Sequence, residues 1–152
     1  MRMVAKQFRH WLVGRHGLYM RVALVIVSAL LCATSFPPVR IGWLMWLALV
    51  PFFIALHGTD VRTSFWLSFL FGMLYFGIPL HWFKNIFGIA CIGVYVLGAV
   101  GPMLFGIARS LVERAWGATI ACILTPVLWV GAEFFQSELW YFRFSWLKVG
   151  LS

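Results

Sequence analysis

The sequence contains few acidic residues and few charges of any kind. Asp and Glu account for four of its 152 residues, Lys and Arg for twelve, and charged residues together for 11%. It also lacks a carboxylate pair with a supporting base and histidines at the spacing of zinc ligands. A Gly-x-Ser-x-Gly turn and a phosphate-binding glycine loop are absent from the sequence as well. These absences argue against the common hydrolase, metalloenzyme and nucleotide-binding sites. We expect no catalytic residue, no cofactor and no metal in this chain.

Cysteine is scarce as well. Cys32, Cys91 and Cys122 all lie inside apolar runs, and no two of them form a Cys-x-x-Cys pair. A thiol in apolar surroundings stays protonated and unreactive, and an odd number of cysteines argues against a disulfide framework. We therefore expect no thiol chemistry.

Apolar residues, by contrast, are abundant. They make up 63% of the chain, aromatic residues make up 18%, and the mean hydropathy is +0.95, which is more apolar surface than a small soluble core can bury. Five continuous apolar runs follow one another, over residues 22–36, 41–57, 63–83, 86–108 and 117–135. A spanning helix needs about 20 residues and satisfies its own backbone hydrogen bonds. We predict an all-α membrane protein, a bundle of about five transmembrane helices whose membrane domain covers residues 22–135.

The segments on either side of this domain differ in composition. Residues 1–21 interleave basic and apolar side chains, which predicts a basic amphipathic leader lying among lipid headgroups. Residues 136–152 are predicted to form an extracytoplasmic aromatic loop. Within the runs, Pro79 and Pro102 should kink their helices, so neighbouring helices must donate to the carbonyls that these prolines leave free.

The placement of basic residues predicts the orientation. Eight of the twelve fall on the side of the leader, namely Arg2, Lys6, Arg9, Arg15, Arg21, Arg62, Arg109 and Arg114. The other side receives Arg40, Lys84, Arg143 and Lys148. This asymmetry favours a cytoplasmic N-terminus and, with five passes, a C-terminal end on the outer side. The net charge of +8 then needs no nucleic-acid partner to explain it.

One acidic residue, Glu133, lies within an otherwise apolar run, "TPVLWVGAEFFQ" (residues 125–136). Helical spacing places it on one side together with the small and polar residues of this run, which are Thr125, Pro126, Trp129, Ala132 and Gln136. This side should face protein, because a carboxylate facing lipid costs at least about 2.5 kcal/mol. We expect Glu133 to have a partner, with Arg143 or Lys148 as candidates. Two interpretations stay open: a packing residue, or part of a pocket for a substrate headgroup.

Four stretches resemble, in order, the landmarks of a known family. They are "SFPPVRIGWLMWLALVPFFIAL" (35–56), "FLFGMLYFGIPLHWF" (69–83), "TPVLWVGAEFF" (125–135) and "FRFSWLKVGLS" (142–152). Together they resemble the N-terminal membrane region of apolipoprotein N-acyltransferase. The matching positions, which the resemblance makes candidates for a structural role or a lipid pocket, are Trp82, Pro126, Trp129, Glu133, Phe144 and Trp146. Two positions depart from the family: Ser145 replaces a usual proline, and Gln136 stands close to where an arginine is common.

The resemblance implies a function in bacterial lipoprotein maturation and a multi-pass location in the bacterial inner membrane. Because the family continues beyond its fourth landmark, the resemblance also implies that the loop over residues 136–152 is truncated. Members move an acyl chain from a phospholipid to the N-terminal amino group of a diacylated lipoprotein, using Glu, Lys and Cys of an extracytoplasmic nitrilase-like domain. None of those catalytic positions lies in this chain, so we expect it to be inactive alone and to act with phospholipid and, in addition, with a lipoprotein or a separate catalytic domain. The alternatives are a stand-alone membrane protein that binds lipid or a partner and, with less support, a small transporter.

Overall fold

The computed structural model describes residues 15–36 and 42–141, and all regular structure in these ranges is helical. The all-α prediction is therefore confirmed for the described part of the chain. The elements, in chain order, are α2 (Arg15–Ser35), η1 (Gly42–Leu44), α3 (Met45–Ala48), α4 (Val50–Leu56), α5 (Val61–Gly77), η2 (His81–Phe83), α6 (Lys84–Phe87), η3 (Gly88–Ala90), α7 (Cys91–Phe134) and the π-helical turn η4 (Phe135–Leu139).

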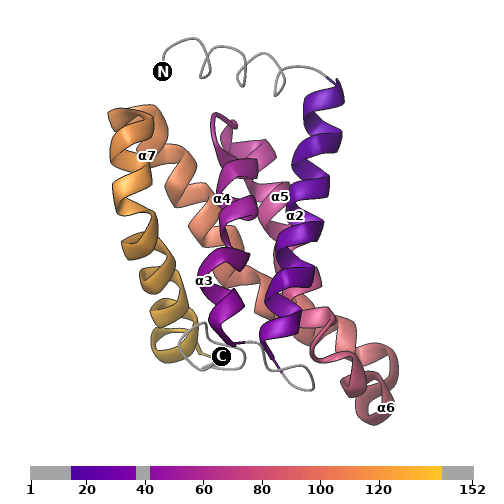
Figure 1. The fold of residues 1–152 in the computed structure, drawn as a ribbon. Coiled ribbons are helices and arrows are strands. Elements are labelled where there is room, and N and C mark those ends of the chain that lie inside the picture. The colour runs from indigo at the N-terminus through magenta and orange to yellow at the C-terminus, as the bar shows by residue number, and fades with distance from the viewer. Residues whose placement is uncertain (1–14, 37–41, 142–152) are drawn as a thin grey trace.

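The long element α7 reverses direction at Gly117. This residue has φ 86° and ψ 169°, a conformation that only glycine adopts without strain. Figure 1 shows the consequence: the chain runs up one side of the molecule, turns, and descends along another path. We call residues 91–116 the first arm of α7 and residues 118–134 the second arm. They form a helical hairpin.

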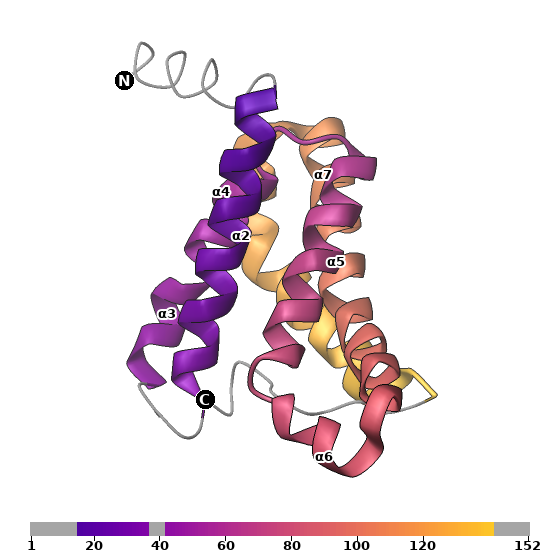
Figure 2. The same ribbon diagram turned by 90° about the vertical axis from the view of Figure 1, so that its right-hand side faces the viewer.

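The helices run alternately up and down between two ends of the molecule (Figures 1 and 2). One end holds the start of α2, the turn from α4 to α5 (residues 57–60) and Gly117, and we call it the Gly117 end. The other holds the end of α5, α6 and η4, and we call it the η4 end. The apolar run 41–57 is not one continuous helix, because it breaks at Leu49 and restarts with Pro51 in the first turn of α4.

Helices α5 and α7 make the most extensive pairing. Ser64, Ser68 and Gly72 recur at every fourth position of α5 and form a strip of small buried residues. A methyl group added to Gly72 would lie 2.6 Å from the Cα atom of Ala99, so the two backbones approach closely. This Ser-x-x-x-Ser-x-x-x-Gly spacing is a packing signal that the sequence analysis missed.

Two stretches of the described chain are long and apolar enough to cross a membrane, Gly17–Ser35 and His81–Leu139. The second includes both arms of α7 and so contains the reversal at Gly117. Five membrane passes remain a prediction.

Candidate functional site

The second arm of α7 is joined to the other helices by Trp129. Its indole ring is 7% exposed and meets an aromatic cluster formed by α4, α5 and the first arm. The ring centroids of Trp129 and Phe105 are 5.1 Å apart in an edge-on arrangement, and Phe52 stacks on Phe71 at 4.1 Å. The Nε1–H group of Trp129 is buried without a hydrogen-bond partner among the described residues. Trp129 is thus a core residue with one unused donor.

Other residues of the same run divide between two faces of the second arm. Thr125 is buried and its hydroxyl donates to the Ala121 carbonyl at 2.7 Å, whereas Pro126 is exposed. Glu133 is half-buried and lies within electrostatic range of the buried Tyr75. The candidate side is therefore partly turned inward, with Thr125, Trp129 and Gln136 buried.

Several sequence predictions for this region fall outside the described residues. These are the candidate pocket residues Phe144 and Trp146 and the candidate partners of Glu133, Arg143 and Lys148. An ion pair of Glu133 with either of them stays a prediction. Trp82 lies elsewhere, on η2 at the η4 end, where it is exposed and packs edge-on against Phe83 at 4.3 Å.

Gln136 makes a contact that closes the hairpin at the η4 end. Its Nε2 amide donates to the Gly98 carbonyl at 3.0 Å and to the Leu97 carbonyl at 3.3 Å. Pro102 has no backbone N–H, so the Gly98 carbonyl, four residues earlier, lacks its helical donor. The prediction that a neighbouring helix satisfies such a carbonyl is confirmed here. Gly101 makes room, because a methyl group at this position would lie 2.0 Å from the Gln136 Oε1 atom.

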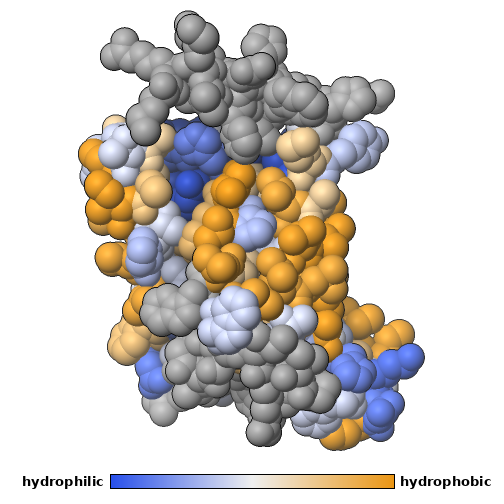
Figure 3. All heavy atoms as spheres, in the orientation of Figure 1, coloured by the Kyte–Doolittle hydropathy of each residue, from blue (hydrophilic) through white to orange (hydrophobic). Residues whose placement is uncertain are grey.

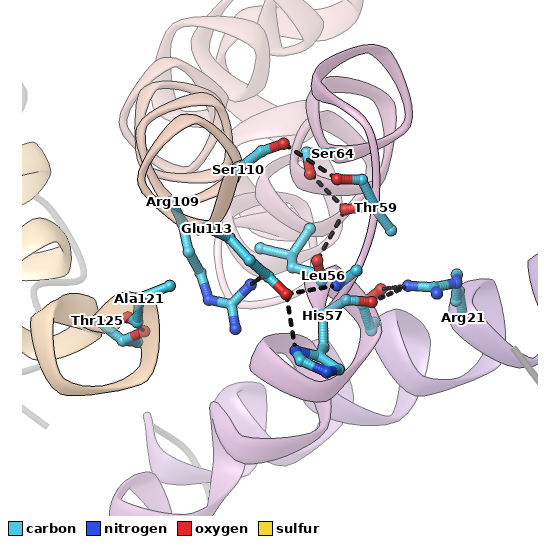
Figure 4. A network of polar contacts seen from close by, with 12 residues as sticks. Arg21, Leu56, His57, Thr59, Ser64, Arg109, Ser110, Glu113, Ala121 and Thr125 are labelled. Atoms are coloured by element: carbon cyan, nitrogen blue, oxygen red, sulfur yellow. Dashed lines mark hydrogen bonds and ion pairs between the residues drawn. The ribbon is translucent and has the colours of Figure 1, made fainter. Parts of the chain in front are cut away.

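A polar cluster gathers at the Gly117 end (Figure 4). The carboxylate of Glu113 accepts from the Gly58 backbone N–H at 3.0 Å and from Arg109 Nη1 at 3.1 Å, and it lies 3.0 Å from His57 Nδ1. Arg21 of α2 donates to the carbonyls of Ala55 and His57. The cluster ties the turn between α4 and α5 to both α2 and α7, which is a structural role.

Asp60 begins α5 at the same end. Its carboxylate accepts from the backbone N–H groups of Arg62 and Thr63 and from the Thr63 hydroxyl. These hydrogen bonds to the charged form, the Thr63 hydroxyl foremost, lower the pKa of Asp60. The sequence analysis missed this N-cap and the Glu113 cluster, although Asp followed by a long helical run is a recognisable start signal.

The exposed surface has the distribution expected at a lipid bilayer. On the face drawn in Figure 3, hydrophobic residues cover much of the middle, while strongly hydrophilic residues gather in the upper part, left of centre, and at the lower right. Exposed aromatic residues lie toward both ends: Tyr19, Trp66 and Trp116 toward the Gly117 end, and Trp43, Trp82 and Tyr141 toward the η4 end. Aromatic side chains concentrate in this way at the two interfaces of membrane proteins. The fold and surface thus define a helical domain of membrane-protein type.

Residues 28–152 match the family model of the apolipoprotein N-acyltransferase N-terminal domain, and the chain belongs to this family. The apolipoprotein N-acyltransferase of Gloeobacter violaceus is 33% identical in an alignment of 116 residues that covers 67% of this chain and 22% of that protein. The corresponding protein of Geobacter metallireducens is 29% identical in an alignment of 136 residues that covers 84% of this chain and 26% of that protein. The chain thus spans about a quarter of the length of these curated relatives. No solved structure matches it significantly.

Proposed function

We propose that this chain forms the membrane-embedded part of an acyltransferase that moves an acyl chain from a phospholipid to the N-terminal amino group of a lipoprotein. The observation that carries the proposal is the family match over residues 28–152. The apolar exposed middle and the aromatic residues at both ends support a location in the bilayer. Phospholipid is the proposed lipid partner, and a diacylated lipoprotein is the proposed acceptor.

The proposed topology has five passes in the bacterial inner membrane. Helix α2, the α3–α4 pair, α5 and the two arms of α7 would each cross once, with the Gly117 end in the cytoplasm. The described basic residues Arg21, Arg62, Arg109 and Arg114 lie toward that end, in agreement with the positive-inside rule. Reporter fusions at residue 1 and after residue 152 test this. A reporter that works only in the periplasm should be silent at the first site and active at the second.

We further propose that a polypeptide of residues 1–152 transfers no acyl group by itself. Acyl transfer through a thioester needs an activated thiolate with a base and an oxyanion stabiliser. Cys32 and Cys91 are buried, Cys122 lies on the exposed side of the second arm, and the sequence carries no catalytic motif beside any of them. Mass spectrometry of a diacylated lipopeptide incubated with the purified chain and phospholipid should show no added acyl chain. Turnover that disappears on replacing one of these cysteines would contradict this.

The proposed role of the candidate residues is to shape a route for acyl chains beside the second arm. Trp129 and Glu133 lie on its inward side, Pro126 lies on its exposed side, and Trp82 lies at the η4 end. Phe144 and Trp146, which are outside the described residues, are proposed to contribute as well. A phospholipid with a photoreactive acyl chain should label the second arm and η4 in preference to α2. If α2 and the second arm are both labelled in proportion to their exposed apolar area, the lipid contact is general and there is no defined route for acyl chains.

A further inference from the structure

The chain between α5 and α7 forms a small lobe. Sequence hydropathy includes most of it in two membrane runs, 63–83 and 86–108, but the structure folds residues 78–90 into a turn and the short helices η2, α6 and η3. Figure 1 shows this segment projecting to one side of the bundle at the η4 end, and Figure 2, which looks from that side, shows it at the bottom of the molecule. We call residues 78–90 the α6 lobe.

The inner side of the α6 lobe is fixed to the bundle. Leu80 and Phe83 are buried, and so is Cys91, which follows the lobe directly. The Tyr95 hydroxyl of the first arm donates to the Leu80 carbonyl at 2.9 Å. The lobe is therefore attached to the bundle through its inner side, and this attachment leaves its outer side exposed.

The outer side of the α6 lobe is apolar. Ile86, Phe87 and Ile89 are 64%, 53% and 86% exposed. Gly88 has φ 55° and ψ −132°, a backbone conformation suited to glycine, and a methyl group added there would meet no atom within 4 Å. The backbone conformation of the turn between Phe87 and Ile89 therefore requires glycine, although the surroundings would have room for a larger side chain. Adjacent exposed apolar side chains of this size mark a contact surface.

The neighbours of this apolar surface indicate what covers it. Ile92 and Val96 of the first arm continue the exposed apolar side chains toward the middle of the molecule. Lys84 and Trp82 lie beside it, and both are exposed. A lysine with an apolar stem, a tryptophan and inserted aliphatic residues together are typical of a segment lying in the headgroup region.

We propose that the α6 lobe lies in the membrane interface on the side of the η4 end. Ile86, Phe87 and Ile89 insert among the upper parts of the acyl chains, and Lys84 reaches the phospholipid headgroups. This inference rests on the proposed membrane location of the chain. It assigns to the lobe, which includes Trp82, the role of a lipid-contacting anchor separate from the spanning helices.

Depth-dependent fluorescence quenching tests the proposal on the 152-residue chain in phospholipid vesicles. An environment-sensitive dye is attached to Ile89→Cys in a background with Cys32, Cys91 and Cys122 replaced by Ala. Quenching lipids carry a spin label either near the headgroup or near the end of the acyl chain. Matched controls are Val127→Cys, exposed within the second arm, and Arg62→Cys, exposed at the Gly117 end. Because Cys91 is buried, a second version keeps all three cysteines and carries a fluorescent amino acid at position 89.

The Ile89 probe should lose more fluorescence to the shallow label than to the deep one, and the Val127 probe should show the reverse. An Ile89 probe as little quenched as Arg62, while Val127 is quenched, would overturn the interface placement and leave the membrane location intact. An Ile89 probe quenched most by the deep label would also overturn it, because the segment would then lie in the hydrocarbon core. A Val127 probe that neither label quenches would overturn the membrane location itself.

Discussion

Gln136 donates its side-chain amide to the Gly98 carbonyl at 3.0 Å and so supplies the hydrogen bond that Pro102 withholds from the first arm of α7. The hydrogen bond that is missing within the first arm is thereby supplied by η4, which directly follows the second arm. Gln136 is 5% exposed, so this bond forms away from solvent, where an unpaired carbonyl is costly.

Gln136→Leu should destabilise the chain by about 1–3 kcal/mol, because the Gly98 carbonyl loses its donor. In a Pro102→Ala background the penalty should shrink, since the new backbone N–H can bond Gly98 within the helix. Thermal or denaturant unfolding in detergent of the four proteins of this cycle measures the coupling. An equal penalty in both backgrounds would mean that the amide is not compensating for the proline.

Gly117→Ala should destabilise the hairpin by about 1–3 kcal/mol, because its φ of 86° is strained for any residue with a Cβ atom. Gly93→Ala is the matched control. Gly93 is an exposed helical glycine with no atom within 4 Å of an added methyl group, so alanine there should be neutral or stabilise by about 0.5–1 kcal/mol. Similar losses for both variants in detergent melting would argue against a conformational requirement at the reversal.

The physical origin of the fold explains which parts of it could be predicted. Long apolar runs without alternation dictate helices, so the all-α class followed from the sequence, as did the need to satisfy the carbonyl freed by Pro102. The family followed from four ordered motifs.

The Glu113 cluster could not be anticipated, because it joins Arg21, His57 and Glu113, which are far apart in the chain and meet only after three helices have packed. The α6 lobe could not be predicted from the sequence, because hydropathy assigns its apolar residues to membrane-spanning helices. The pairing of Gln136 with the Gly98 carbonyl, which Pro102 leaves free, was likewise a tertiary contact that helical spacing does not reveal.

Replacing Glu133 by Gln should be milder than replacing it by Leu. Glutamine can still hydrogen-bond a partner, whereas leucine leaves that partner unsatisfied at a cost of about 1–3 kcal/mol. Melting of the two variants in detergent makes the comparison, with Val130→Leu, an exposed apolar exchange on the same arm, as the control. Equal stability of the Gln and Leu variants would show that Glu133 holds no hydrogen-bonded partner.

The contribution of Asp60 should depend on pH. Since hydrogen bonds lower the pKa of this carboxyl in the folded state, its stabilisation is present above the ordinary pKa of Asp and is lost as the pH falls through the lower folded-state value. Asp60→Asn keeps a capping oxygen but cannot titrate, so the stability of this variant should not show the loss at acidic pH that Asp60 causes. In unfolding curves across the acidic range, the stabilities of the two proteins should differ above the ordinary pKa of Asp and converge only below the lower folded-state pKa of Asp60. Parallel pH profiles would contradict the assignment.

The central claim is that this chain is the membrane part of a lipoprotein acyltransferase. It is tested most directly by a chimera in which this chain replaces the membrane region of a relative. Residues 28–152 replace the matching region of a complete relative, and the chimera is produced in cells depleted of their own enzyme. Transfer of a third acyl chain to lipoproteins is then measured by mass spectrometry, with an inactive catalytic-cysteine variant of the same chimera as control. The account predicts that the chimera acylates lipoproteins and the control does not. A chimera that is stable and inserted in the membrane, yet transfers no acyl chain, would contradict it.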